Sequence, residues 1–193
     1  MNNYEYIIAS LPVLQEGYRG PLAADDILEE IREQLSASDA AQLQLVLDGW
    51  NPEKLTEEFY TRASKSHNSF VRAYFLYDLQ LRNAKVAWLN KALGRQEGKD
   101  MLSCPEEDFE DAALAAEVLS QNDILGRERG LDDMLWKRID ALTVMHVFDL
   151  DVILGFVAKL KITDRWLKLD ENTGRALFAR LVNDMKSQYL QNQ

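Results

Sequence analysis

The chain has 193 residues, of which 47% are hydrophobic and 28% are charged, and its net charge at pH 7 is −10. A chain of this length and composition buries enough apolar surface to form a core, which excludes global disorder. The longest apolar stretch, residues 152–158, is much shorter than the roughly 20 residues of a transmembrane helix, so we expect no direct membrane insertion. The single cysteine, Cys104, excludes an intrachain disulfide and fits a reducing compartment.

The first elements of the chain change from an extended segment to helices. Residues 4–12 are rich in β-branched and aromatic side chains and end at a proline, which predicts a short extended N-terminal segment. Beyond a turn that contains Gly17 and Gly20, apolar residues recur at steps of three and four, which predicts helices. These predicted helices cover residues 25–35, 38–49 and 51–60.

The most persistent helical pattern runs over residues 68–93 and stops at Gly94, a residue that commonly ends helices. This pattern predicts one long central helix. Residues 95–105 contain Gly98 and Pro105 among polar side chains and form the best interior break.

Helical spacing returns in the second half of the chain. A run of acidic residues after Pro105 suits the start of a helix, and Asp132 and Asp133 suit another after a loop around Gly126 and Gly130. The predicted helices cover residues 105–119, 132–145, 149–167 and 172–190. Several aromatic residues of the chain are mostly candidates for the core: Tyr74, Phe75, Tyr77, Trp88, Trp136, Phe148, Phe156 and Trp166.

We therefore expect a mainly all-α fold, a multi-helix bundle with one long central helix and a short extended N-terminal segment. The prediction for domain organisation is a single helical domain over 1–193, with a possible subdivision into helical halves at 1–100 and 101–193.

Motifs for catalysis or metal binding do not stand out. Neither His67 nor His146 has a second His or Cys at zinc-binding spacing, and the acidic neighbours of Cys104 would raise the pKa of its thiol. The glycines of residues 94–100 are one residue too close for a phosphate-binding loop. We therefore predict a non-catalytic protein with no metal, no cofactor and no small-molecule substrate. An enzyme that uses dispersed carboxylates is the alternative.

Charge is distributed unevenly along the chain. Residues 62–99 contain eight basic and two acidic residues, a net charge of +6, so the remainder carries −16. This pattern suggests electrostatic docking onto an acidic partner, whereas the strongly acidic remainder argues against nucleic acid. The alternative is that these residues form a solvated face or pair with the protein's own acidic helices. The candidate partner-binding residues are Arg72, Arg82, Asn83, Lys85 and Lys91.

Three segments together resemble a known bacterial family, domain of unknown function 2764. The first two are the opening residues 4–12 and the central residues 68–83. The third is a C-terminal pattern that comprises residues 133–138, Phe148, Ile153, Lys159, Leu160, Arg165 and Trp166.

The resemblance implies a place in a rotary motor. Members of the family are typically encoded among the components of bacterial V/A-type ATPases, and the stretch from Asp78 to Arg82 and Asn83 is similar to a helix of the C-type stalk component, which is called d in eukaryotes. That component is an all-helical funnel that couples the central stalk to the membrane ring during proton or sodium transport. The resemblance implies other V/A-type ATPase subunits as partners and a cytoplasmic location, peripheral to the inner membrane through the complex. A free-standing helical adaptor or regulator is the alternative.

Overall fold

A computed structural model describes residues 4–105 and 108–169, and within these two ranges every regular element is helical, as the sequence predicts. In chain order the elements are α1 (Glu5–Ser10), α2 (Ala24–Gln34), α3 (Ala37–Asp48), the 3₁₀ turn η1 (Pro52–Lys54), α4 (Glu57–Ser64), α5 (Ser69–Ala92), α6 (Ala112–Leu119), α7 (Ile124–Thr143) and α8 (Leu150–Lys168).

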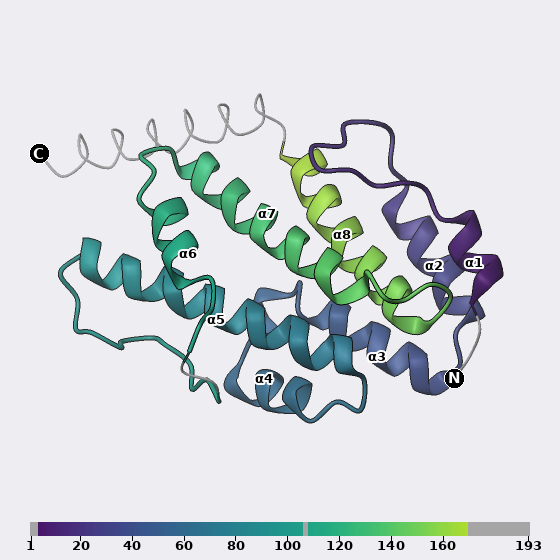
Figure 1. Cartoon of the computed structure of the whole chain (residues 1–193), viewed down its shortest axis with the longest axis horizontal. Coiled ribbons are helices and arrows are strands. Elements are labelled where there is room, and N and C mark those ends of the chain that lie inside the picture. Colours follow the sequence, from purple (N-terminus) through teal and green to yellow (C-terminus); the bar gives the residue numbers. More distant parts are fainter. Residues whose placement is uncertain (1–3, 106–107, 170–193) are drawn as a thin grey trace, which may run out of the picture.

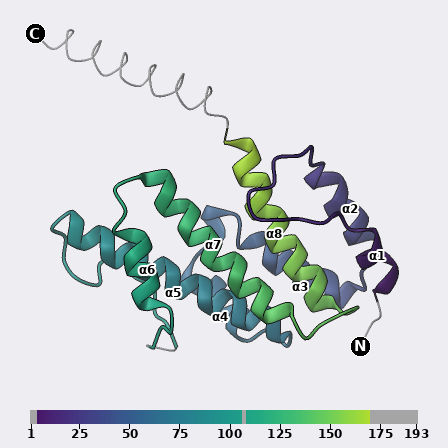
Figure 2. The ribbon, with the colours of Figure 1, turned by 45° about the horizontal axis from the view of Figure 1, so that its top comes forward.

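The bundle is organised around α5, α7 and α8. Helix α5 packs against α3, α4, α6, α7 and α8, and α7 packs along α8. Figure 1 shows α4 on the outer side of α5, with α1 and α2 beside α8 at one end of the bundle, and Figure 2 shows the same arrangement. Side chains from four helices meet in the core and are fully buried, among them Leu43, Phe70, Ile139, Leu154 and Val157.

Helix α5 matches its predicted limits. The side chain of Asn68 caps it by accepting a hydrogen bond from the backbone N–H of Val71 (2.8 Å), and Gly94 follows its end with φ = +61°, a conformation that favours glycine. The same Asn68 side chain donates to Asp151 in the first turn of α8. Helix α5 is the longest described helix with 24 residues, but α7 has 20 and α8 has 19, so a single long central helix is confirmed only in part.

The prediction of an extended N-terminus is wrong, because residues 5–10 form helix α1. Tyr4 and Ile7 are buried, and Ile8 and Leu11 pack against the same core. This spacing of three and four residues places one side of a helix on the bundle, and that burial outweighs the preference of these residue types for strands. The hydroxyl of Tyr4 also donates to Asp39 (2.5 Å).

The prediction of a loop around Gly126 and Gly130 is also wrong, because both glycines lie inside α7. A Cβ atom on Gly130 would lie only 2.6 Å from Cγ1 of Val118, so this glycine permits the close approach of α6 and α7. Asp132 consequently lies in the middle of α7, where it is buried, and does not cap a helix.

Other helix limits differ by a few residues. Helix α6 begins at Ala112 and not at Pro105, and residues 51–60 divide into η1 and the start of α4. Helix α8 is capped by Asp149, as predicted. The predicted helix at 172–190 lies outside the described residues.

Candidate functional site

The five candidate partner-binding residues all lie on α5, but only two are exposed. Arg72 is exposed near the start of the helix, where its Nη1 donates to the backbone carbonyl of Ser66 (2.6 Å). Lys91 is exposed in the last turn. These two residues remain available for a partner.

Asn83 is buried and holds the connection between α5 and α6. Its Nδ2 donates to the carbonyl of Leu102 (2.8 Å), and its Oδ1 accepts from the N–H of the same residue (3.0 Å). Further along α5, Asn90 donates to the carbonyl of Lys99 (2.7 Å). Asn83 therefore positions the chain that follows α5 and does not present a docking surface.

Lys85 forms an ion pair with Glu128 on α7, with 2.5 Å between Nζ and Oε1. For this residue the structure favours pairing with the protein's own acidic side chains, which was the alternative to docking. The pair ties α5 to α7 along one side of the bundle.

Arg82 belongs to a polar cluster between α4 and α5. The hydroxyl of Tyr60 donates to Asp78 (2.6 Å), and Arg82 is close enough to both side chains to lower their pKa values. Burial dominates for both groups: it raises the pKa of the Asp78 carboxyl, and it raises the pKa of Tyr60 well above its ordinary value. The half-buried Arg82 side chain thus contributes to the polar contacts that hold α4 against α5.

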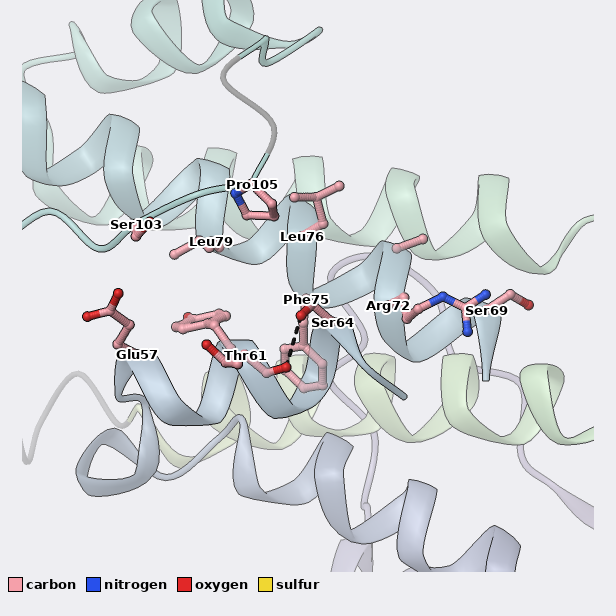
Figure 3. A pocket seen from close by; sticks show the side chains of 12 residues that line it. Glu57, Thr61, Ser64, Ser69, Arg72, Phe75, Leu76, Leu79, Ser103 and Pro105 are labelled. Carbon is pink, nitrogen blue, oxygen red and sulfur yellow. Dashed lines mark hydrogen bonds between the residues drawn. The ribbon is translucent and has the colours of Figure 1, made fainter. Parts of the chain in front are cut away.

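Beside this cluster lies a groove of about 710 Å³ between α4, α5 and residues 103–105. Its floor is apolar and includes Phe75, Leu76 and Leu79, while hydroxyl groups of α4 and α5 line its edges. Figure 3 shows Glu57 at one end of the groove and Arg72 at the other. We call this cavity the α4–α5 groove. The sequence alone did not indicate it.

A second polar cluster in the bundle also escaped sequence reasoning. The buried carboxylate of Asp132 accepts hydrogen bonds from Trp166 Nε1 (2.6 Å) and from Arg165. Burial raises the pKa of Asp132, although the Arg165 guanidinium opposes that shift. In the sequence, Arg165 and Trp166 stand next to each other near the end of a predicted helix. That adjacency alone does not indicate that both side chains bind Asp132.

The loop between α7 and α8 exposes several apolar side chains. Met145 is 86% exposed, Val144 74% and Val147 61%, and Phe148 is also exposed. The prediction that Phe148 lies in the core is therefore wrong. His146 anchors the loop through a hydrogen bond of 2.6 Å between its Nδ1 and Asp149.

The described residues contain neither a metal-binding cluster nor a membrane-spanning helix. Among residues 4–105 and 108–169, no three His, Cys, Asp or Glu side chains gather closely enough to hold a metal ion. Within the described helices, none combines the length and apolar character that crossing a membrane requires.

The described chain is thus an all-helical bundle with a groove on one side. Residues 102–189 match the model of a protein family described as "Protein of unknown function (DUF2764)", and this match supports the family that the sequence resembles. No curated protein and no solved structure matches the chain.

Proposed function

We propose that this protein is a non-catalytic part of a bacterial V/A-type rotary ATPase, similar to its C-type stalk component, and that it couples the central stalk to the membrane ring. The resemblance of residues 78–83 to a helix of the C-type component supports the proposal. The family model that matches residues 102–189 is itself described only as of unknown function. A coupling component must transmit force without deforming, so it needs a stiff element with side chains left free to bind neighbours.

The observation that carries the proposal is the way α5 is fixed. Side chains cross-link it on several sides: Asn83 binds the following connection, Lys85 binds α7, and Asp78 binds α4. At the end of this braced helix Lys91 remains exposed, and both views show the last turns of α5 extending beyond α6 and α7. A braced helix with an exposed basic end suits docking onto an acidic neighbour.

Copurification tests the proposal. An affinity-tagged copy expressed in the native host should bring down the stalk and ring subunits of the ATPase in stoichiometric amounts. An intact, active ATPase isolated without this chain would contradict the proposal.

A charge-reversal variant tests the contribution of α5. We expect Lys91→Glu to reduce copurification, and Lys137→Glu, at another exposed lysine on α7, to have no effect. Circular dichroism should show wild-type helicity for both variants. Equal copurification of the two would remove Lys91 from the interface.

The second candidate function is a free-standing helical adaptor, and the exposed apolar loop around Met145 favours it. The two candidates differ in stoichiometry. Native mass spectrometry of the purified ATPase should find a constant number of copies if the chain is an integral component, and a variable number if it is an adaptor that binds and leaves.

A further inference from the structure

The α4–α5 groove is long enough to bind a third helix of nearly three turns. Along α5 it is lined by Ser69, Arg72, Ala73, Leu76 and Leu79, which recur at steps of three and four and so share one face of the helix. At 1.5 Å per residue this face is about 15 Å long, which is the length of nearly three helical turns. Side chains of a third helix fit between two neighbouring helices in the way that ridges pack into grooves.

The floor of the groove is already formed in the free protein. The ring of Phe75 is nearly fully buried and packs edge-on against Phe59, with 4.9 Å between the ring centroids, and against Tyr74 at 5.0 Å. Leu76 is only half-buried and offers apolar surface to a ligand. A rigid floor reduces the entropy that a ligand must overcome on binding.

The two ends of the groove carry opposite charges. The exposed Glu57 lies at one end and the exposed Arg72 at the other, as Figure 3 shows. Among the described residues, neither side chain lies within 4.0 Å of an oppositely charged group. Arg72 uses one nitrogen to hold the carbonyl of Ser66, and its guanidinium has further donors.

We propose that the α4–α5 groove binds an amphipathic helix of a partner protein in one defined direction. The N-terminal end of that helix, which carries partial positive charge, lies at Glu57, and its C-terminal end lies at Arg72. The helix therefore runs parallel to α4. Its apolar residues, at positions i, i+3 or i+4, and i+7, contact the floor at Leu76.

Charge complementarity further specifies the partner. A basic residue in the first turn of the bound helix pairs with Glu57, and an acidic residue in its last turn pairs with Arg72. The inference stands independently of the proposed function, because it rests on the groove alone and applies to any assembly that contains this chain.

A displayed library of randomised 14-residue helical peptides tests the inference, with the full chain as bait. We expect the selected peptides to share the apolar spacing, a basic first turn and an acidic last turn. Their dissociation constants are then measured by fluorescence anisotropy at low ionic strength. Leu76→Glu should weaken binding at least tenfold, whereas the same substitution on the same helix outside the groove, Leu89→Glu, should change it less than twofold.

Two further variants keep the test decisive. Ser64→Tyr places a bulky side chain at an exposed edge of the groove, where it does not disturb the core, and should also weaken binding at least tenfold. In the double variant Glu57→Lys, Arg72→Glu, a new selection should recover peptides with the charges exchanged. The inference is overturned if no peptide binds, if the selected peptides bind the Leu76→Glu and Ser64→Tyr variants as tightly as the wild type, or if the charge preference does not reverse.

Discussion

Gly49, the residue that ends α3, lies directly against the floor of the α4–α5 groove. A Cβ atom at this position would lie 2.7 Å from Cζ of Phe75 and closer still to Cε1, distances that real Cβ atoms essentially never show. The backbone of Gly49 is in the ordinary right-handed helical region, so an alanine there would suffer no backbone strain. Gly49→Ala therefore tests the packing of the ring alone.

The expected cost follows from two opposing effects. Overpacking a well-filled core costs about 1–3 kcal/mol, and the Phe75 ring has little room to retreat because Phe59 and Tyr74 pack against it. Replacing glycine by alanine in a compatible conformation restores about 0.4–1 kcal/mol, because it restricts the unfolded chain. We therefore expect Gly49→Ala to lower the free energy of unfolding by about 1–2 kcal/mol, which lowers Tm by about 2–8 °C for a chain of this size.

Urea and thermal unfolding followed by circular dichroism measure this change. The control is Gly126→Ala in the first turns of α7, where the atoms nearest to a new Cβ are side-chain oxygens of Gln121 and Asp123 at 3.0 and 3.1 Å. The end of Gln121 can move aside, and the Asp123 carboxylate, which caps α7 by accepting from the N–H of Gly126, need shift only slightly. We therefore expect Gly126→Ala to lose less stability than Gly49→Ala. The reasoning is refuted if Gly49→Ala is as stable as the wild type, or if its cost persists when Phe75 is also replaced by leucine.

Three other predictions concern polar side chains. The hydrogen bond to Asp149 raises the pKa of His146, so the folded state holds this proton more tightly than the unfolded state. As the pH rises from about 6 to 8, the free energy of unfolding of the wild type should therefore fall relative to that of His146→Asn, by less than about 1 kcal/mol. Urea titrations of both proteins at the two pH values measure this change. If the difference in stability between the two proteins does not depend on pH, the result counts against the pairing of His146 with Asp149. Asn83→Ala should free the backbone of Leu102 and speed tryptic cleavage of the α5–α6 connection several-fold, with unchanged cleavage as the contrary result. Asp132→Ala should lower the free energy of unfolding by about 2–3 kcal/mol, because two donors lose their buried acceptor; a loss below about 0.5 kcal/mol would show that the cluster contributes little.

The sequence was sufficient where the signal for structure is local. Asn68 and Gly94 mark the two ends of α5 through a side-chain cap and a positive φ, and both act within a few residues of their own position. Asp149 marks the start of α8 in the same way, since its carboxylate accepts from the N–H groups of Asp151 and Val152. Such features need no knowledge of tertiary contacts.

Local reasoning was insufficient where tertiary packing decides the structure. Ile7 and Ile8 have strand-forming side chains, yet they are helical because the bundle buries one side of α1. Glycine is typical of loops, yet Gly130 lies within α7 because Val118 of α6 occupies the space where a side chain would be. Neither contact could be inferred from the neighbours in the sequence.

The candidate site shows the same division. The sequence shows that α5 is basic, but it does not show which acidic side chain Lys85 binds, because that residue, Glu128, lies 43 residues away in the chain. The groove depends on the placement of α4 against α5, so its opposed charges at Glu57 and Arg72 became visible only in three dimensions.

The cap of α5 has a mechanical consequence. Because Asn68 both begins α5 and donates to Asp151 in the first turn of α8, one amide fixes the register of two helices whose starts are more than 80 residues apart in the chain. Sliding either helix along its axis by one turn, about 5.4 Å, would break the cap and the cross-link together. We therefore expect a force along α8 to be transmitted to α5 through the Asn68 side chain, so that the two helices move together.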